Sequence, residues 1–203
     1  MTQGEIANFL KDHDQFRQRT IVIVDFGNVE KWKNSLNWKV GVPELARLVK
    51  NFSTGKVFLR RFYYGADFGK HEACQIMTPW SDKILNRAKI NGFEVVAKRV
   101  KYICSKDSVF GFEKKCDLDV EMAVDLIQER DNYDTIILFS GDGDLVRALE
   151  YLSKEYGKKS IVMSARGHIG REVIDAQKIG VISEILFADD FEYRLNMERF
   201  IRR

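Results

Sequence analysis

Two aspartates separated by one glycine follow an apolar run near the middle of the chain. The run covers residues 135–139, and Asp142 and Asp144 come directly after a short turn. A second unbroken apolar run, residues 21–24, ends on Asp25. Such runs are typical of strands buried on both faces of a parallel sheet. Because ligands of open α/β sheets bind at the carboxyl ends of the strands, we expect these carboxylates to share one crevice.

Asn28 follows Asp25 by three positions and adds an amide to the same predicted crevice. Asp and Asn just after a strand are also common turn and helix-capping residues. The alternative is therefore that Asp25, Asn28, Asp142 and Asp144 only cap the elements that follow them.

A further carboxylate comes from the segment 117–130, which has the periodicity of an amphipathic helix. At 100° per residue, Asp119 projects from the middle of its apolar stripe, so its side chain is expected to face inward. Burying a lone ionised carboxylate is costly unless it is paired or holds a cation. The alternative is that Asp119 caps the first turn of this helix. The residues of the apolar stripe are Leu118, Met122, Ala123, Leu126 and Ile127.

Carboxylate oxygens with no histidine or cysteine among the ligands favour hard divalent cations such as Mg²⁺ or Mn²⁺. At such a site the expected reaction is attack of a metal-activated water on a phosphodiester. Asn28 is expected to position the water or the phosphate. The chain has no Walker loop, no dinucleotide-binding glycine motif and no Gly-x-Ser-x-Gly elbow. A phosphatase with Asp25 as nucleophile would usually have a second acid two residues later, where this chain has Gly27.

Basic residues are concentrated between positions 60 and 115, although the net charge is only +3. If they face one groove, they form a phosphate track that leads to the acidic centre. The alternative is that they are ordinary solvated side chains. Trp32 and Trp38 either stack bases or cover the core. The predicted RNA contacts are Arg60, Arg61, Lys98, Arg99, Lys114 and Lys115.

Length and composition fit one sizeable globular domain, since the chain has 203 residues of which 45% are hydrophobic and 31% charged. No run approaches the length of a membrane span, and the first twenty residues are too polar for a secretory signal. We therefore expect a cytoplasmic protein that does not associate with membranes. Three cysteines at irregular spacing fit a reducing compartment. With His71 they number four potential zinc ligands, but no tight Cys-x-x-Cys pair supports a zinc site.

Strands alternating with helices predict an α/β fold, with a three-layer, doubly wound, mostly parallel sheet of about five to six strands. The expected strands cover residues 20–26, 56–64, 93–100, 135–139, 158–163 and 181–187. Helices are expected within 3–18, from Pro43 to about 51, within 70–91 with a break at Pro79, and over 117–130, 145–152 and from about 169. Residues 30–39 and 101–116 are expected to be loops.

Residues 24–28, 119–125 and 140–144 resemble, in order and spacing, the three motifs of the LabA-like NYN domains, which are members of the PIN-like nuclease superfamily. The resemblance covers roughly residues 18–190. It implies a PIN-like fold and a metal-dependent ribonuclease. By this resemblance Asp25, Asp119, Asp142 and Asp144 are the acidic centre, with Asn28 beside them.

The sequence thus predicts a Mg²⁺- or Mn²⁺-dependent endoribonuclease that acts on single-stranded or structured RNA. The alternative is a non-catalytic RNA-binding or regulatory module that uses the same crevice. We expect an N-terminal helix over residues 1–18 packed on the domain, a catalytic domain over 19–190 and a basic C-terminal extension over 191–203. Exposed tryptophans and the C-terminal Phe200 and Ile201 offer an interface for a homodimer.

Overall fold

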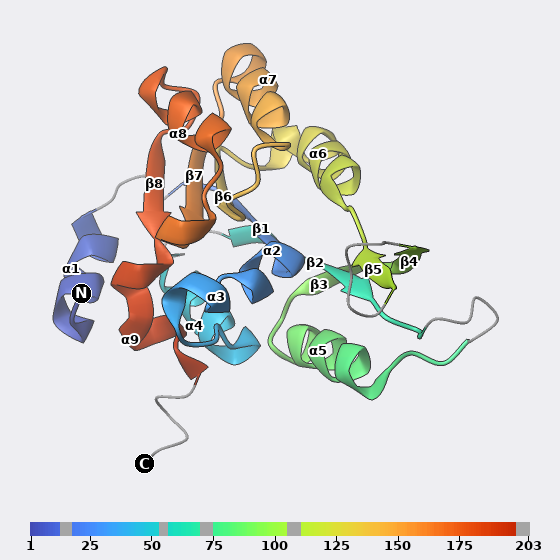
Figure 1. Cartoon of the computed structure of the whole chain (residues 1–203). Helices are drawn as coiled ribbons and strands as arrows, with labels where there is room; N and C mark the ends of the chain where they lie inside the picture. The colour runs from blue at the N-terminus through green and yellow to red at the C-terminus, as the bar shows by residue number, and fades with distance from the viewer. Residues whose placement is uncertain (13–17, 53–56, 70–74, 105–110, 198–203) are drawn as a thin grey trace.

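Six parallel strands form the central sheet of the protein. The computed structural model describes residues 1–12, 18–52, 57–69, 75–104 and 111–197. The strands are β1 (Thr20–Asp25), β2 (Val57–Ala66), β3 (Glu94–Arg99), β6 (Thr135–Phe139), β7 (Lys159–Ser164) and β8 (Glu184–Phe187). Their order in the sheet is β3-β2-β1-β6-β7-β8, and every neighbouring pair is parallel (Figure 1). The chain runs from β1 to one side of the sheet and returns to the other side at β6, so the switch point lies between these two strands.

Helices cover both faces of the sheet (Figure 1). One face carries α1 (Gln3–Asp12), α2 (Phe26–Lys31), α3 (Lys33–Leu36), α4 (Val42–Phe52), α5 (Pro79–Ile90) and α9 (Glu192–Leu195), whose buried side chains join one hydrophobic cluster. The other face carries α6 (Asp119–Gln128), α7 (Val146–Tyr156) and α8 (Arg171–Lys178). Short 3₁₀ turns are η2 (Arg130–Asn132), η3 (Arg166–His168) and η4 (Ala188–Phe191). The prediction of a three-layer α/β fold is confirmed.

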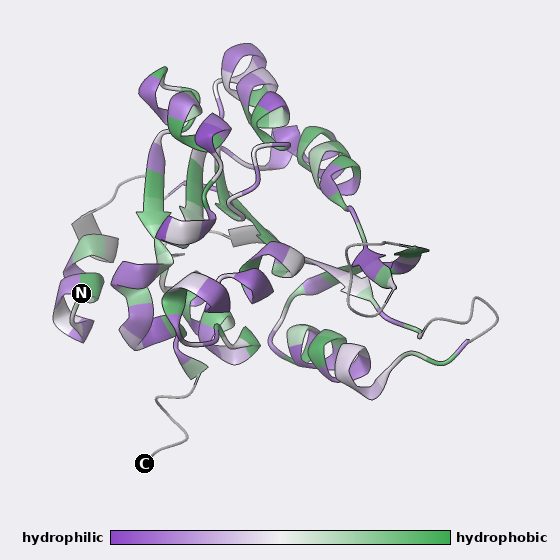
Figure 2. Ribbon diagram, viewed as in Figure 1, coloured by the Kyte–Doolittle hydropathy of each residue, from purple (hydrophilic) through white to green (hydrophobic). Residues whose placement is uncertain are grey.

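The two cores arise from the alternation of side chains along the central strands. In β1, Val22 and Val24 point into the α4 side, whereas Ile21 and Ile23 point into the α6 side. Figure 2 shows hydrophobic residues along the strands and mixed hydropathy around the helices. A strand covered on both faces is apolar at every position, which explains the unbroken run over residues 21–24.

Residues 101–116 were expected to be a loop, but part of this segment forms two strands. They include an antiparallel pair, β4 (Lys101–Cys104) and β5 (Phe112–Lys115), in which Lys101 lies opposite Lys115 and Cys104 opposite Phe112. These strands are mostly exposed on both faces, so no alternation of apolar and polar residues marks them. The prediction of a loop was wrong for the described part of this segment.

Two further segments differ from their predicted structures. Residues 30–39 were expected to be a loop, but α2 begins directly after Asp25 and α3 follows it. Trp32 between them is fully buried, so it belongs to the core. The helix expected within 70–91 starts at Pro79, with Thr78 accepting a hydrogen bond from the Ser81 amide. Proline suits a first helical turn because its missing N–H needs no partner there.

The two chain ends pack near each other on the α4 side of the sheet. Ile6 of α1 is fully buried, and Phe9 contacts Phe191 edge to face with ring centroids 5.9 Å apart. In the segment predicted as a C-terminal extension, α9 packs against α4 through the buried Leu195. Residues 198–203 lie outside the described residues. Across the described chain, helices are too short or too polar to cross a lipid bilayer.

Candidate active site

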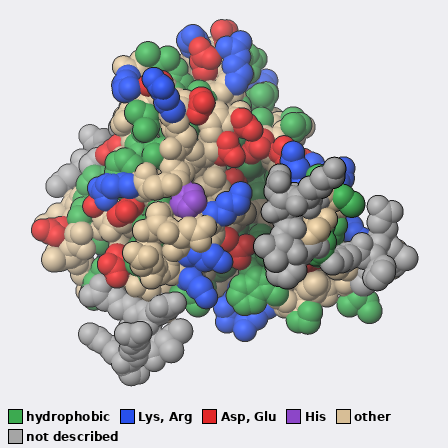
Figure 3. Space-filling view, viewed as in Figure 1, with side chains coloured by type: hydrophobic (Ala, Val, Ile, Leu, Met, Phe, Trp, Pro, Cys, Tyr) green, Lys and Arg blue, Asp and Glu red, His purple; other side chains and the backbone are tan. Residues whose placement is uncertain are grey.

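A cavity of about 830 Å³ opens at the carboxyl ends of β1 and β6, where the strand order reverses. Open α/β sheets bind ligands at this position. All five residues that the sequence singled out as the catalytic centre line the cavity. Figure 3 shows acidic side chains and Lys and Arg side chains bordering one another on the face viewed in Figure 1. The five residues are Asp25, Asn28, Asp119, Asp142 and Asp144.

Three of the carboxylates converge on one point. Asp119, Asp142 and Asp144 each offer an oxygen, and these oxygens all lie within 4.8 Å of one another. Asp119 and Asp142 are half-buried, and Asp144 is exposed. Asp25 lines the same cavity but does not belong to this tight group. The structure therefore brings three of the four predicted ligands together and places the fourth beside them.

The turn after β6 holds Asp142 and Asp144 through its own backbone. The Asp142 amide donates to Ser140 Oγ at 3.2 Å, and the Asp144 amide donates to Asp142 Oδ1 at 3.2 Å. Gly141 packs so closely that an added Cβ would lie 1.9 Å from the carbonyl oxygen of His168. Only glycine fits this approach, and the turn is thereby pressed against η3.

Asp25 caps α2 and also ties β1 to β6. Its Oδ1 accepts the Asn28 amide at 3.1 Å, and its Oδ2 accepts the Ser140 hydroxyl at 3.0 Å. Burial raises the pKa of Asp25, and these two hydrogen bonds and Lys31 offset part of that effect, whereas Asp142 adds to it. The capping alternative is thus true of Asp25 and does not remove it from the site.

Asn28 uses its side-chain oxygen to join three elements. Oδ1 accepts the Trp32 indole N–H at 2.8 Å and the Gly141 amide at 3.1 Å. The expected role of Asn28 with water or phosphate stays a prediction. In the structure its carbonyl group fixes the turn after β6 relative to α2.

Asp119 is the first residue of α6, and the capping bond at this end comes from another aspartate. Asp117 Oδ1 accepts the Asp119 amide at 3.0 Å, and Asp119 makes no capping bond of its own. The pKa of Asp119 is raised to about 7 by burial, then by its hydrogen bond and charge interaction with Asp117, and by the charges of Asp142 and Asp25. Its carboxylate belongs to the acidic group and is half-buried. The helical periodicity had predicted only that this side chain faces inward.

These residues fit a hard divalent cation. The donors are carboxylate oxygens within 4.8 Å of one another. Burial is the first cause of the raised pKa of Asp119, and repulsion by the charges of Asp117, Asp142 and Asp25 adds to it. A cation relieves that repulsion, and Mg²⁺ and Mn²⁺ prefer oxygen ligands. Four residues were considered above as potential zinc ligands. Of these, Cys104 is an exposed free thiol and Cys116 is a half-buried free thiol, and His71 and Cys74 lie outside the described residues.

Of the six basic residues predicted to contact RNA, two line the cavity. Lys114 and Lys115 extend from β5 at its edge, and Lys114 Nζ lies 2.6 Å from Asp67 Oδ2. Lys98 is close to the cavity but donates to Glu121 at 2.7 Å and to the Asp117 carbonyl at 3.0 Å.

The three arginines of the predicted track lie away from the cavity lining. Arg61 faces α6, where it pairs with Asp125 at 3.2 Å and Glu129 at 3.4 Å, and its side chain is only 13% exposed. Arg60 is half-buried on β2. The Arg99 guanidinium lies 5.0 Å from the centre of the Phe68 ring. The described basic residues between positions 60 and 115 therefore do not form one continuous track.

The sequence reasoning missed several residues of the cavity, among them Lys31, Asp67 and Trp80. Lys31 lies one turn after Asn28, and helical spacing from the end of β1 would have indicated it. Asp67 comes directly after β2, and Asp25 is the last residue of β1, so the same strand-end rule applied to Asp67. Trp80, which is 62% exposed, had no signal in the sequence beyond its type.

Comparisons with known proteins agree with this architecture. The family model of the NYN domain matches residues 19–184. The low amplitude and bright protein LabA of Synechococcus elongatus is 34% identical over 85 residues, which are 42% of this chain and 45% of LabA. The chain thus matches less than half the length of that relative. A crystal structure of a protein of unknown function from Vibrio parahaemolyticus superposes with a TM-score of 0.63 at 22% identity, covering 86% of this chain and 95% of that one. With the family model spanning most of its length, this chain belongs to the NYN domain family.

Proposed function

We propose that the protein is a Mg²⁺- or Mn²⁺-dependent ribonuclease that cuts RNA by metal-assisted hydrolysis. The observation that carries this proposal is the group of three carboxylates within 4.8 Å at the switch point of the sheet. Membership of a family of PIN-like nucleases supports the same chemistry. We assign the ligand role to Asp119, Asp142 and Asp144, with Asp25 next to them.

In this proposal the ion supplies an activated water and stabilises the charge that develops on the phosphate. Lys31 and Lys115 at the cavity edge bind the phosphates that flank the cleaved bond. Asp25 and Asn28 hold the two strand ends at a fixed separation through Ser140 and Gly141. The chain thus contributes a rigid set of oxygen donors, and its cations orient the substrate.

The experiment is cleavage of labelled RNA by the purified protein with Mn²⁺ or with chelator. We expect metal-dependent cleavage that falls by at least about 10-fold in Asp142→Asn and in Asp144→Asn, because loss of a charged ligand should cost no less than the 10- to 100-fold typical of residues that only support a ligand. Asp131→Asn is the matched control, since that side chain is 78% exposed and lies outside the cavity.

Cleavage that survives both ligand substitutions would come from a contaminant and would refute the proposal. RNA binding without turnover at any divalent ion would instead favour the non-catalytic RNA-binding module. Detection of several turnovers per protein molecule excludes that alternative.

A further inference from the structure

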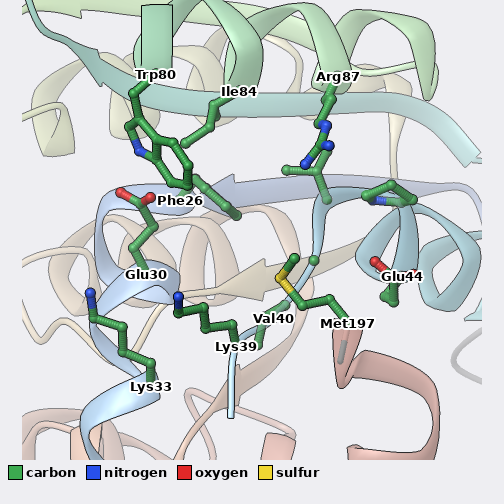
Figure 4. Close-up of a pocket in the computed structure, with 13 residues that line it drawn as sticks. Phe26, Glu30, Lys33, Lys39, Val40, Glu44, Trp80, Ile84, Arg87 and Met197 are labelled. Carbon is green, nitrogen blue, oxygen red and sulfur yellow. The ribbon is translucent and has the colours of Figure 1, made fainter. Parts of the chain in front are cut away.

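A second cavity of about 400 Å³ lies beside the acidic one, between α2, α5 and the segment that leads into α4 (Figure 4). Its apolar surface comes from Phe26, Val40, Ile84 and Met197. The volume lies within the range of roughly 300–1,000 Å³ that is usual for small-molecule pockets. It is therefore large enough to receive one planar heterocycle.

The two cavities share a wall made by Trp80 and Glu30, which line both. Trp80 is 62% exposed, and its indole lies next to the half-buried Glu30 carboxylate (Figure 4). Much of the apolar surface of the indole is therefore open to a ligand. A ligand that lies along Trp80 can pass from the acidic cavity into the apolar one.

The edge of the apolar cavity is positively charged. Arg87 extends from α5, and Lys33 and Lys39 lie on the opposite side in Figure 4. Among the residues that the structure describes, Lys39 and Arg87 form no ion pair. Glu44, the second acid of the lining, pairs with Arg47 instead. The ligand expected here therefore combines a flat apolar part with negative charge.

We propose that this apolar cavity receives one unstacked base of single-stranded RNA, whose backbone runs past Trp80 to the acidic centre. The inference rests on the proposed function and narrows its substrate class. Exposed aromatic side chains beside cations are how proteins bind single strands, because every base has a stacking face. A base inside a duplex is stacked on both faces and paired with a base of the other strand, so it does not reach such a pocket. Lys39 and Arg87 contact the phosphates next to the inserted base.

The test measures the affinity of a labelled single-stranded RNA oligonucleotide in chelator, so that nothing is cut. Trp80→Ala should weaken binding by about 5- to 100-fold, the range for loss of one base–aromatic stack. Trp80→Phe should retain most of the affinity because a ring remains. Tyr151→Ala is the control, since Tyr151 is an exposed aromatic side chain on α7 outside both cavities. Thermal melting checks that each variant is folded.

A second arm moves a single abasic nucleotide along the oligonucleotide. For the wild type, an abasic nucleotide at one position should lower the affinity by a factor similar to that of Trp80→Ala. For Trp80→Ala itself, the abasic nucleotide at that position should lower the affinity little further. The two losses then describe the same contact, because changes at one contact are not additive. The same sequence annealed into a duplex should bind more weakly than the single strand and be cut more slowly in Mn²⁺.

If the wild type cuts RNA but Trp80→Ala binds and cuts as before, or if the duplex is the better substrate, the base pocket is refuted and the ribonuclease remains. If the wild type neither binds nor cuts RNA, the proposed function fails and this inference fails with it. A change of molecular mass in Trp80→Ala by light scattering, with RNA affinity intact, would assign the cavity to a second copy of the chain and also overturn the proposal.

Discussion

Replacing Asp119 by Asn tests the acidic centre through the stability of the protein. The pKa of Asp119 is raised from 3.8 to about 7, so its charge at neutral pH opposes folding. Carried fully into the free energy of unfolding, this shift is worth roughly 4 kcal/mol. The side chain is only half-buried, and solvent screening reduces that to about 1–2 kcal/mol. In chelator at pH 7.5, Asp119→Asn should therefore melt about 2–8 °C higher than the wild type.

The pH dependence of this gain has a defined sign. Between pH 4 and 7 the folded protein holds a proton on Asp119 that the unfolded chain has lost, so wild-type stability falls as pH rises through this range. The advantage of Asp119→Asn is complete above pH 7 and disappears as the pH is lowered toward 4. Melting curves at several pH values in chelator measure this difference directly.

Metal should reverse the order of the two proteins. An ion that binds only the folded state stabilises it by about 2.7 kcal/mol at one hundred times its dissociation constant. The wild type should gain this stability on addition of Mn²⁺, and Asp119→Asn should gain less because it has lost one ligand. Asp131→Asn is the control, because that side chain is 78% exposed and lies outside the cavity, so its replacement should leave the response to Mn²⁺ unchanged.

The outcome that would refute this reasoning is a lower melting temperature of Asp119→Asn in chelator together with an unchanged response to Mn²⁺. Asp119 would then stabilise the start of α6 through its charge, as an ordinary helix-terminal aspartate does, and would not be a ligand.

Two further substitutions separate packing from RNA binding. Gly141→Ala should lower the free energy of unfolding by about 1–3 kcal/mol or more, because its Cβ would lie 1.9 Å from a backbone oxygen. Thermal melting measures the loss. Gly4→Ala in α1, where nothing lies within 4 Å, should cost nothing, and equal losses in the two variants would contradict the packing argument. Lys115→Ala should reduce the slope of log affinity against log salt by about 0.7 for single-stranded RNA. Arg61→Ala should lower the melting temperature and leave this slope unchanged, because Arg61 pairs with acids of α6. A smaller slope in Arg61→Ala would instead support the RNA contact predicted for Arg61.

The sheet was predictable because each central strand is covered on both faces. Full burial makes nearly every position of β1 and β6 apolar, and an apolar run of this length between turn residues is typical of a central parallel strand. The β4–β5 pair was not predictable because its strands are mostly exposed, and pairing depends on backbone hydrogen bonds that leave no pattern of hydrophobicity.

The acids of the site were predictable, whereas four of the six predicted cations do not line the cavity. A carboxylate at the end of a buried strand is placed by the strand itself, and Asp119 is placed by the apolar stripe of its helix, so position along the chain gives position in space. A lysine or arginine on an outer strand can face either side of the sheet. Arg61 faces α6 and pairs with acids there, although Arg60 and Arg61, like Lys114 and Lys115, are two adjacent basic residues in the chain. The homodimer also remains a prediction that only a measurement of mass can test.

The capping bonds of these residues are compatible with the ligand role that we propose, and they show how the fold holds a cluster of acids. Asp25 caps α2 and accepts the Ser140 hydroxyl, while Asn28 accepts the Gly141 amide. These bonds fasten the ends of β1 and β6 to each other. The fold thus holds its carboxylates close together, although burial and the charges of Asp117, Asp142 and Asp25 raise the pKa of Asp119. For the ion that we propose, ligands fixed in this way need no further ordering, so relief of the repulsion between like charges should add to metal affinity.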